Sequence, residues 1–105
     1  MSTYIIILVT AKDKKEAAKI ADGLLKAKLI ACANIIKDVQ SFFWWQGKVD
    51  KATEVLLVLK TQKKLFEKIV TKVKSLHSYQ TPEIIALPIV AGSKDYLKWI
   101  SDSVK

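Results

Sequence analysis

Arginine is absent from this chain of 105 residues, and its 18 basic side chains are all lysines. Because arginine is the usual bidentate ligand of phosphate and guanine, its absence argues against sequence-specific recognition of nucleic acid. A net charge of +8 still attracts polyanions at low salt. The lysines alternate with acidic and apolar residues along the expected helices instead of forming a block. We therefore interpret them as a solvated surface that favours solubility, with a non-specific polyanion site as the weaker alternative.

Cysteine is nearly absent too, since Cys32 is the only one. A single cysteine excludes an intramolecular disulfide, and no CxxC or histidine-rich cluster indicates structural zinc. No uncharged apolar stretch approaches the roughly 20 residues that cross a bilayer, and residues 4–9 lack the basic leader of a signal peptide. These features predict a cytoplasmic protein without a membrane partner.

The sequence also lacks the motifs of common enzymes. With one histidine, it offers no convincing Ser-His-Asp order, and it contains neither HExxH nor a glycine-rich phosphate loop. Cys32 has no neighbouring base in the sequence that would activate it as a nucleophile. We therefore expect no enzymatic activity.

The length fits one domain spanning residues 1–105. Thr3–Thr10 is a nearly continuous β-branched and apolar run, which predicts a central strand. Asp13 and Glu16 have the spacing of a capping box and predict the start of a helix. Apolar residues then recur at helical spacing and would face the sheet: Ala17, Ile20, Ala21, Leu24 and Leu25.

Two long strands are expected over residues 30–43 and 49–59, with Gln46-Gly47 near the reversal. Thr61 is predicted to cap a second helix that ends near His77. Its apolar face would consist of Leu65, Phe66, Ile69, Val70, Val73 and Leu76.

Pro82 disfavours helical geometry before it, and Ile84–Val90 then predicts a last strand. Pro88 lacks a backbone donor, so this strand should lie at an edge or contain a bulge. A short helix capped by Ser93 would end the chain.

The element order is βαββαβ with a terminal helix, which predicts an α+β, ferredoxin-like sandwich with both main helices on one face of an antiparallel sheet. The other face would then expose more apolar surface than soluble monomers tolerate. We infer self-association, either as a closed ring or as a two-fold dimer, since both would bury the sheet and its edges.

Two segments carry a family resemblance. The first is Phe42-Phe43-Trp44-Trp45-Gln46-Gly47-Lys48, followed by Glu54 and the run from Val55 to Thr61, and the second is His77-Ser78-Tyr79-Gln80-Thr81-Pro82-Glu83. With them the chain resembles the CutA family of divalent-cation tolerance proteins over nearly its whole length. The resemblance implies a homotrimer in which a long hairpin reaches neighbouring subunits. It places Trp44 and Trp45 at a subunit contact, and implies a role in tolerance to divalent cations.

His77 is the leading candidate for a metal ligand, because imidazole readily binds copper and zinc. Glu83, Cys32, Tyr79 or another subunit would have to supply further ligands. The alternative for His77 is a helix cap or a hydrogen bond within the loop.

In CutA-like proteins copper binding is tied to a cysteine late in the first strand and to two adjacent histidines at the end of the second helix. Val9 occupies the position of that cysteine, and Leu76-His77 replaces the histidine pair. The resemblance therefore implies weak binding of copper(II) or another divalent cation. We interpret Cys32, which lies between alanines, as a small core residue.

Tyr79, Gln80 and Thr81 are candidates for lining a cleft between subunits, by analogy with the trimeric signalling protein PII. A PII-like trimer that binds a small metabolite or a protein partner is accordingly the alternative function. Glu54 and Glu83 could share a hard cation, although ion pairs with Lys48 or Lys60 are the simpler expectation.

Overall fold

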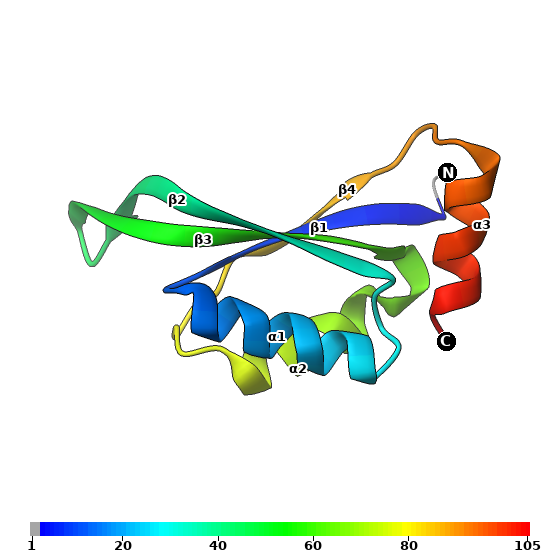
Figure 1. Ribbon diagram of the computed structural model, residues 1–105. Helices are drawn as coiled ribbons and strands as arrows, with labels where there is room; N and C mark the ends of the chain where they lie inside the picture. Colours follow the sequence, from blue (N-terminus) through cyan, green and yellow to red (C-terminus); the bar gives the residue numbers. More distant parts are fainter. Residues whose placement is uncertain (1–2) are drawn as a thin grey trace.

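The apolar run at the start of the chain becomes the central strand of an antiparallel sheet in the computed structural model, which describes residues 3–105 (Figure 1). The four strands are β1 (Tyr4–Ala11), β2 (Cys32–Trp45), β3 (Lys48–Gln62) and β4 (Ile84–Pro88). Their order in the sheet is β2-β3-β1-β4, and all neighbouring pairs are antiparallel. This arrangement confirms the predicted ferredoxin-like fold.

Two helices cover one face of this sheet, α1 (Lys14–Lys26) and α2 (Phe66–Leu76), whereas α3 (Lys94–Ser103) lies at one end (Figure 1). Side chains along β1 alternate between buried and half-buried, because successive residues of a strand point to opposite faces. The buried set faces the helices. The largest fully buried side chains include Ile7, Ile20, Leu24, Leu57, Leu59 and Ile69.

The first helix begins as its sequence predicts. Asp13 Oδ1 accepts a hydrogen bond from Glu16 N at 2.8 Å, and Glu16 Oε1 accepts one from Lys12 N at 3.2 Å. The second bond reaches the residue before the N-cap, so the box is closed one position earlier than in the standard arrangement.

The predicted cap at Thr61 is wrong. Thr61 belongs to β3, where it pairs with Ile5 and donates its hydroxyl proton to the carbonyl oxygen of Leu29 at 2.6 Å. The hydroxyl therefore satisfies a buried carbonyl, and a 3₁₀ turn at Lys63–Leu65 precedes α2 instead.

Two boundaries later in the chain agree with the sequence. The last residue of α2 is Leu76, with His77 as its C-cap, and Ser93 Oγ accepts a hydrogen bond from Tyr96 N at the start of α3. The edge position of β4 is confirmed. Its pairing ends at Pro88, two residues earlier than predicted, where proline has no backbone donor.

The β2–β3 hairpin is longer than the rest of the sheet and extends beyond the helices (Figure 1). At its tip Gln46 and Gly47 have φ angles of 50° and 78°, which is the geometry of a type I′ turn. A β-bulge separates the pair Ile36 and Leu56 from the pair Val39 and Glu54. It divides a half that packs in the core from a half that projects from it.

The face of the sheet opposite α1 and α2 is covered only at one end, where Ser101 of α3 forms hydrogen bonds with the side chains of Tyr4 and Gln62, and no other element of the described chain covers the rest (Figure 1). Large apolar side chains are exposed on it, including Ile36 on β2 and Ile85 and Leu87 on β4. No helix within residues 3–105 is both long and apolar enough to cross a membrane.

Candidate functional site

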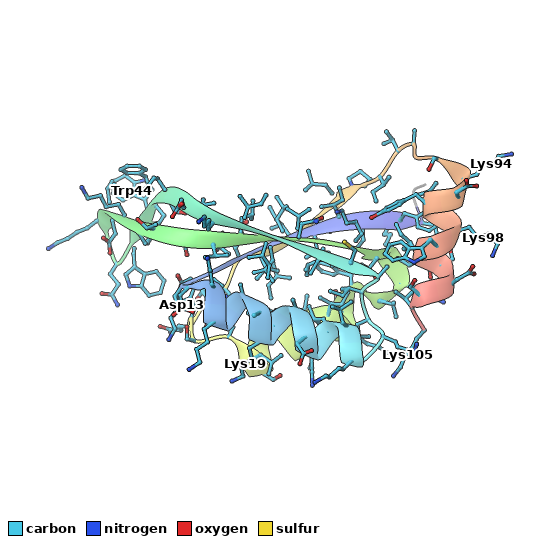
Figure 2. All side chains as sticks on the ribbon, in the orientation of Figure 1. Asp13, Lys19, Trp44, Lys94, Lys98 and Lys105 are labelled. Atoms are coloured by element: carbon cyan, nitrogen blue, oxygen red, sulfur yellow. The ribbon has the colours of Figure 1, made fainter. Side chains whose placement is uncertain are left out.

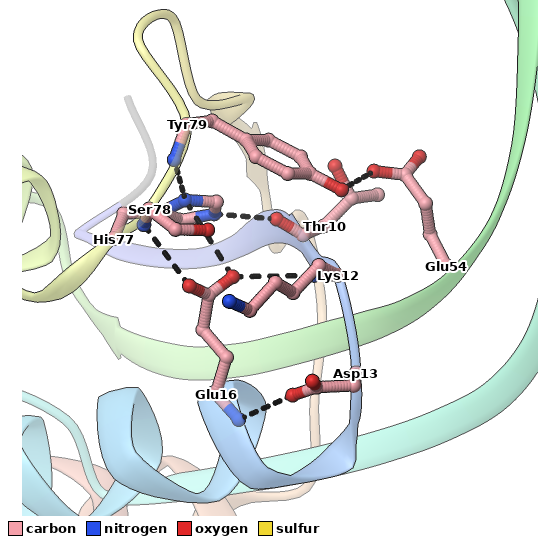
Figure 3. Close-up of polar contacts among 8 residues, drawn as sticks. All are labelled: Thr10, Lys12, Asp13, Glu16, Glu54, His77, Ser78 and Tyr79. Atoms are coloured by element: carbon pink, nitrogen blue, oxygen red, sulfur yellow. Dashed lines mark hydrogen bonds and ion pairs between the residues drawn. The ribbon is translucent and has the colours of Figure 1, made fainter.

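A network of polar side chains joins four elements at one end of the sheet (Figure 3). It connects the loop after α2 to the end of β1, to the first turn of α1 and to the middle of β3. The connections are made by Thr10, Glu16, Glu54, His77, Ser78 and Tyr79.

The His77 side chain is completely buried, and both of its ring nitrogens are engaged. Nδ1 must accept a hydrogen bond because Tyr79 N, at 3.1 Å, can only donate. Nε2 therefore carries the proton and donates to the Thr10 carbonyl oxygen at 2.7 Å. These partners select one neutral tautomer and attach the loop to β1.

Glu16 lies under the same loop and holds it from the helix side. Its Oε2 accepts a hydrogen bond from Ser78 N at 3.0 Å, and Oε1 is 3.7 Å from His77 Nδ1. Burial alone would raise the pKa of Glu16. The hydrogen bonds from Ser78 and Lys12 outweigh burial, so the pKa of Glu16 is lowered from its usual value.

Tyr79 extends the network to the sheet. Its hydroxyl donates to Glu54 Oε2 at 2.7 Å, and its ring packs against the imidazole of His77 with 4.7 Å between centroids. Burial and the hydrogen bond to the Glu54 carboxylate together raise the pKa of Tyr79 far above its usual value. Glu54 is buried beside the bulge, and its hydrogen-bond partner is Tyr79 rather than the Lys48 or Lys60 expected from sequence.

The residues suggested as metal ligands do not converge within one chain. Among the described residues, no three of the types histidine, cysteine, aspartate and glutamate gather closely enough to hold a metal ion. Glu83 is exposed, whereas His77 would have to break one of its hydrogen bonds to bind a metal. Metal binding at His77 and Glu83 remains a prediction, and within this geometry it needs ligands from another subunit.

Cys32 lies in a different part of the sheet. It pairs with Lys60 on β3, four residues from Leu56, which pairs with Thr10 beside His77. At about 3.3 Å per residue this separation is roughly 13 Å, so Cys32 and His77 cannot share a metal within one chain. The predicted core position of Cys32 is wrong in this chain, because the residue is half-buried on the face of the sheet opposite α1 and α2, where Tyr96 of α3 interacts with it.

Two of the three predicted cleft residues line a groove. Gln80 and Thr81 lie with Pro82 against α2, and the groove encloses about 390 Å³. Its other lining residues are Phe66, Glu67, Val70, Lys74 and Ile84. Tyr79 is not among them, because its side chain points toward Glu54.

Trp44 and Trp45 occupy the projecting half of the hairpin, with 74% and 42% of their surface exposed. Phe42 is 71% exposed in the same strand. Figure 2 shows Trp44 at the far end of the molecule from α3. A contact between subunits would cover these rings, and this role remains a prediction.

Sequence reasoning missed Glu16 and Thr10 as members of the site. The capping pattern identified Glu16 only as a residue at the start of a helix. Its position beside the apolar face of that helix was the one signal in the sequence for its burial. Nothing in the sequence relates it to His77 or Ser78, which follow about 60 residues later, because only the packing of α1 against α2 brings them together.

Residues 5–103 match the CutA1 divalent ion tolerance protein family. The divalent-cation tolerance protein CutA of Archaeoglobus fulgidus is 46% identical over 99 residues, which cover 94% of this chain and 96% of that protein.

Solved structures agree with the sequence comparison. The periplasmic divalent cation tolerance protein CutA from Archaeoglobus fulgidus superposes with a TM-score of 0.94 at 44% identity, covering 97% of this chain and 99% of the other. The divalent cation tolerance protein from Thermus thermophilus gives 0.95 at 38% identity with the same coverage. The chain belongs to the CutA1 divalent ion tolerance family.

Proposed function

We propose that this protein acts in divalent-cation tolerance as a cytoplasmic homotrimer, that it catalyses no reaction, and that it binds copper(II) or another divalent cation weakly. The observation that carries the proposal is the family match over residues 5–103, together with relatives named for divalent-cation tolerance. The hydrogen bonds around His77 hold the loop 77–83, which contains both proposed metal ligands, His77 and Glu83.

Assembly is supported by the distribution of apolar surface. Exposed aromatic and aliphatic side chains follow the projecting hairpin and the open sheet face, and soluble monomers seldom expose such continuous patches. Their burial would supply the driving force for association. Trp44 and Trp45 are the proposed anchors, because buried aromatics dominate interface energies.

The small number of metal ligands that one chain brings together favours a metal site between subunits. Divalent copper and zinc need three or four ligands, and one chain brings no such set together among its described residues. In a trimer each loop 77–83 would lie near a neighbour's side chains. We therefore propose that Glu83, which is exposed, ligates together with groups from another subunit and that His77 contributes only if the loop rearranges.

The test combines mass and calorimetry. Light scattering should give three times the chain mass of 11.8 kDa. Copper(II) titrated into this trimer near neutral pH should produce saturable heat at about one ion per subunit or one per trimer. Glu83→Gln should weaken binding, whereas Asp22→Asn, which removes an exposed carboxylate from α1 outside the groove, should not.

A heat no larger than that of a surface-histidine control protein would contradict the metal proposal while leaving the trimer intact. His77→Ala is informative only if light scattering still gives the trimer mass, because this substitution also removes two loop hydrogen bonds. A monomeric mass for the unmodified protein would contradict the assembly proposal.

The alternative is a PII-like trimer that binds a small metabolite or a protein partner, and the groove beside α2 is the observation that favours it. Gln80 and Thr81 provide polar groups there, and Phe66 and Val70 provide apolar walls. This alternative predicts that small anionic metabolites raise the melting temperature and that Thr81→Val abolishes the effect. Copper titration without heat, combined with such a shift, would favour it over metal binding.

A further inference from the structure

The positive charge of the chain is concentrated on the helix layer. Residues 12–28 and 63–76 contain eleven lysines and four acidic residues, a net charge of +7 out of the total of +8. The rest of the chain contributes only +1. We call these side chains the lysine layer: Lys12, Lys14, Lys15, Lys19, Lys26, Lys28, Lys63, Lys64, Lys68, Lys72 and Lys74.

The four acidic residues of these segments reduce the charge from +11 to +7, but they form few ion pairs with the lysines. Glu16 is buried and turned toward the loop after α2, where backbone groups of Ser78 and Lys12 occupy its carboxylate. Asp13 accepts a backbone hydrogen bond as the N-cap of α1. Among the described residues, Lys26 is the one lysine of the layer with an ion pair, to Asp22 at 2.9 Å.

The two helices present their lysines on a common surface. Lys15 and Lys19 are one turn apart on α1, and Lys68 and Lys72 are one turn apart on α2. The contact between α1 and α2 is close at Gly23. A Cβ atom at this position would lie only 3.7 Å from Lys72 Cε of α2. Figure 2 shows Lys19 on the side of α1 that faces away from the sheet.

We propose that the lysine layer binds nucleic acid through its backbone phosphates, without reading the base sequence. Charge complementarity favours this partner, because an extended polyanion releases counterions when lysines neutralise its phosphates. The 13 residues of α1 extend over about 20 Å, a length that matches about six phosphates along one strand. Lysine alone suits this role, since it acts as a point charge that positions a backbone but rarely specifies bases.

An anionic membrane fits this surface less well. Interfacial helices insert aromatic or aliphatic side chains between lipid head groups. On α1 and α2, however, Leu25 is the one exposed large apolar side chain, and the exposed aromatic residues lie on β2 and α3. The layer is therefore charged without an apolar anchor.

This proposal does not depend on metal binding. The sheet face proposed for assembly is opposite the helices, so association of subunits through it leaves the lysine layer accessible (Figure 1). Assembly would instead present several copies of the layer and strengthen binding through multivalency.

The test is fluorescence anisotropy of a labelled 20-base-pair duplex titrated with the full-length protein at 50 to 200 mM salt. Binding should weaken steeply with salt and should be equal for duplexes of unrelated sequence. Lys19→Glu with Lys68→Glu removes one lysine from each helix. The slope of the logarithm of the binding constant against the logarithm of the salt concentration should then become less steep by about two. Lys94→Glu with Lys98→Glu makes the same change in net charge on α3, outside the layer, and should preserve the slope.

Unmodified protein that leaves the anisotropy unchanged at 50 mM salt would overturn the proposal. An equal loss of affinity in the α3 variant would also overturn it, because net charge rather than the layer would then determine binding. Co-sedimentation with phosphatidylserine vesicles tests whether the lysine layer binds the phosphates of a membrane instead of those of nucleic acid. Retention on vesicles under conditions where the duplex does not bind would replace nucleic acid by a membrane.

Discussion

The hydroxyl group of Tyr79 connects a surface loop to the middle of the sheet. It donates to Glu54, a carboxylate with 7% of its surface exposed, next to the bulge in β2. Buried carboxylates are costly unless they are hydrogen-bonded, so this single contact stabilises both the loop and the strand. Gln80 and Thr81 directly follow Tyr79 in this loop, so the same contact also fixes where they lie in the groove.

Tyr79→Phe should therefore lower the free energy of unfolding by about 1.5 to 3 kcal/mol, the usual range for a lost hydrogen bond to a charged group. The ring contact with His77 is retained, so the effect reports the hydroxyl alone. Denaturant unfolding at a fixed protein concentration measures it. The half-exposed Tyr96 is the control. Its hydroxyl interacts with the Cys32 thiol, a weak hydrogen-bonding group, so Tyr96→Phe should change stability by less than about 0.5 kcal/mol. Equal effects of the two changes would remove the special role of Glu54.

Glu16 predicts how stability depends on pH. Its pKa is lower in the folded than in the unfolded protein, so the unfolded chain takes up the proton first as the pH falls. The contribution is fully present above the ordinary pKa of glutamate, about 4.3, and is lost as the pH falls through the folded value. Glu16→Gln should flatten this part of the stability curve, measured by thermal unfolding between pH 6 and pH 3. Glu67→Gln, on the exposed side of α2, should leave its shape unchanged.

At the scale of elements, the N-cap predicted at Asp13 is present in the first turn of α1. Asp13 accepts the N–H of Glu16, and Ala in its place leaves that donor unsatisfied. Asp13→Ala should destabilise the protein by about 1 kcal/mol. Asp22→Ala on the same helix loses only an exposed ion pair with Lys26 and should cost no more than about 0.5 kcal/mol. Chemical denaturation compares them, and a larger effect at Asp22 would contradict the importance of the cap.

At the scale of the whole molecule, the projecting hairpin should control assembly. Replacing both Trp44 and Trp45 by alanine removes two large exposed rings and should weaken the oligomer by at least about 2 kcal/mol. Dilution followed by light scattering should then show dissociation at concentrations where the unmodified protein is assembled. Leu25→Ala, an exposed position on α1, is the control. An oligomer equally resistant in both variants would place the subunit contact elsewhere.

The distribution of the lysine residues differs between the linear sequence and the folded molecule. Along the chain they alternate with acidic and apolar residues, which suggests a dilute, solvated charge. In the fold, α1 and α2 lie side by side on one face, and the acidic residues between the lysines are partly withdrawn into caps and the buried network. The charge is therefore concentrated on one layer.

The sequence by itself determined the element order, the antiparallel architecture, the turn at Gln46-Gly47 and the cap at Asp13. These features depend on periodicity, on glycine's conformational freedom and on hydrogen bonds between residues close in the chain. The family resemblance was also readable from two short segments.

Only the tertiary structure decided the role of Thr61, the partner of Glu54 and the state of His77. Each depends on contacts between residues 25 or more positions apart, and no local pattern specifies which hydrogen-bond partner a buried polar group will find. Local energetics would allow Thr61 to cap a helix. Its hydroxyl instead satisfies the Leu29 carbonyl, because an unpaired carbonyl in the core would cost more than an uncapped helix end.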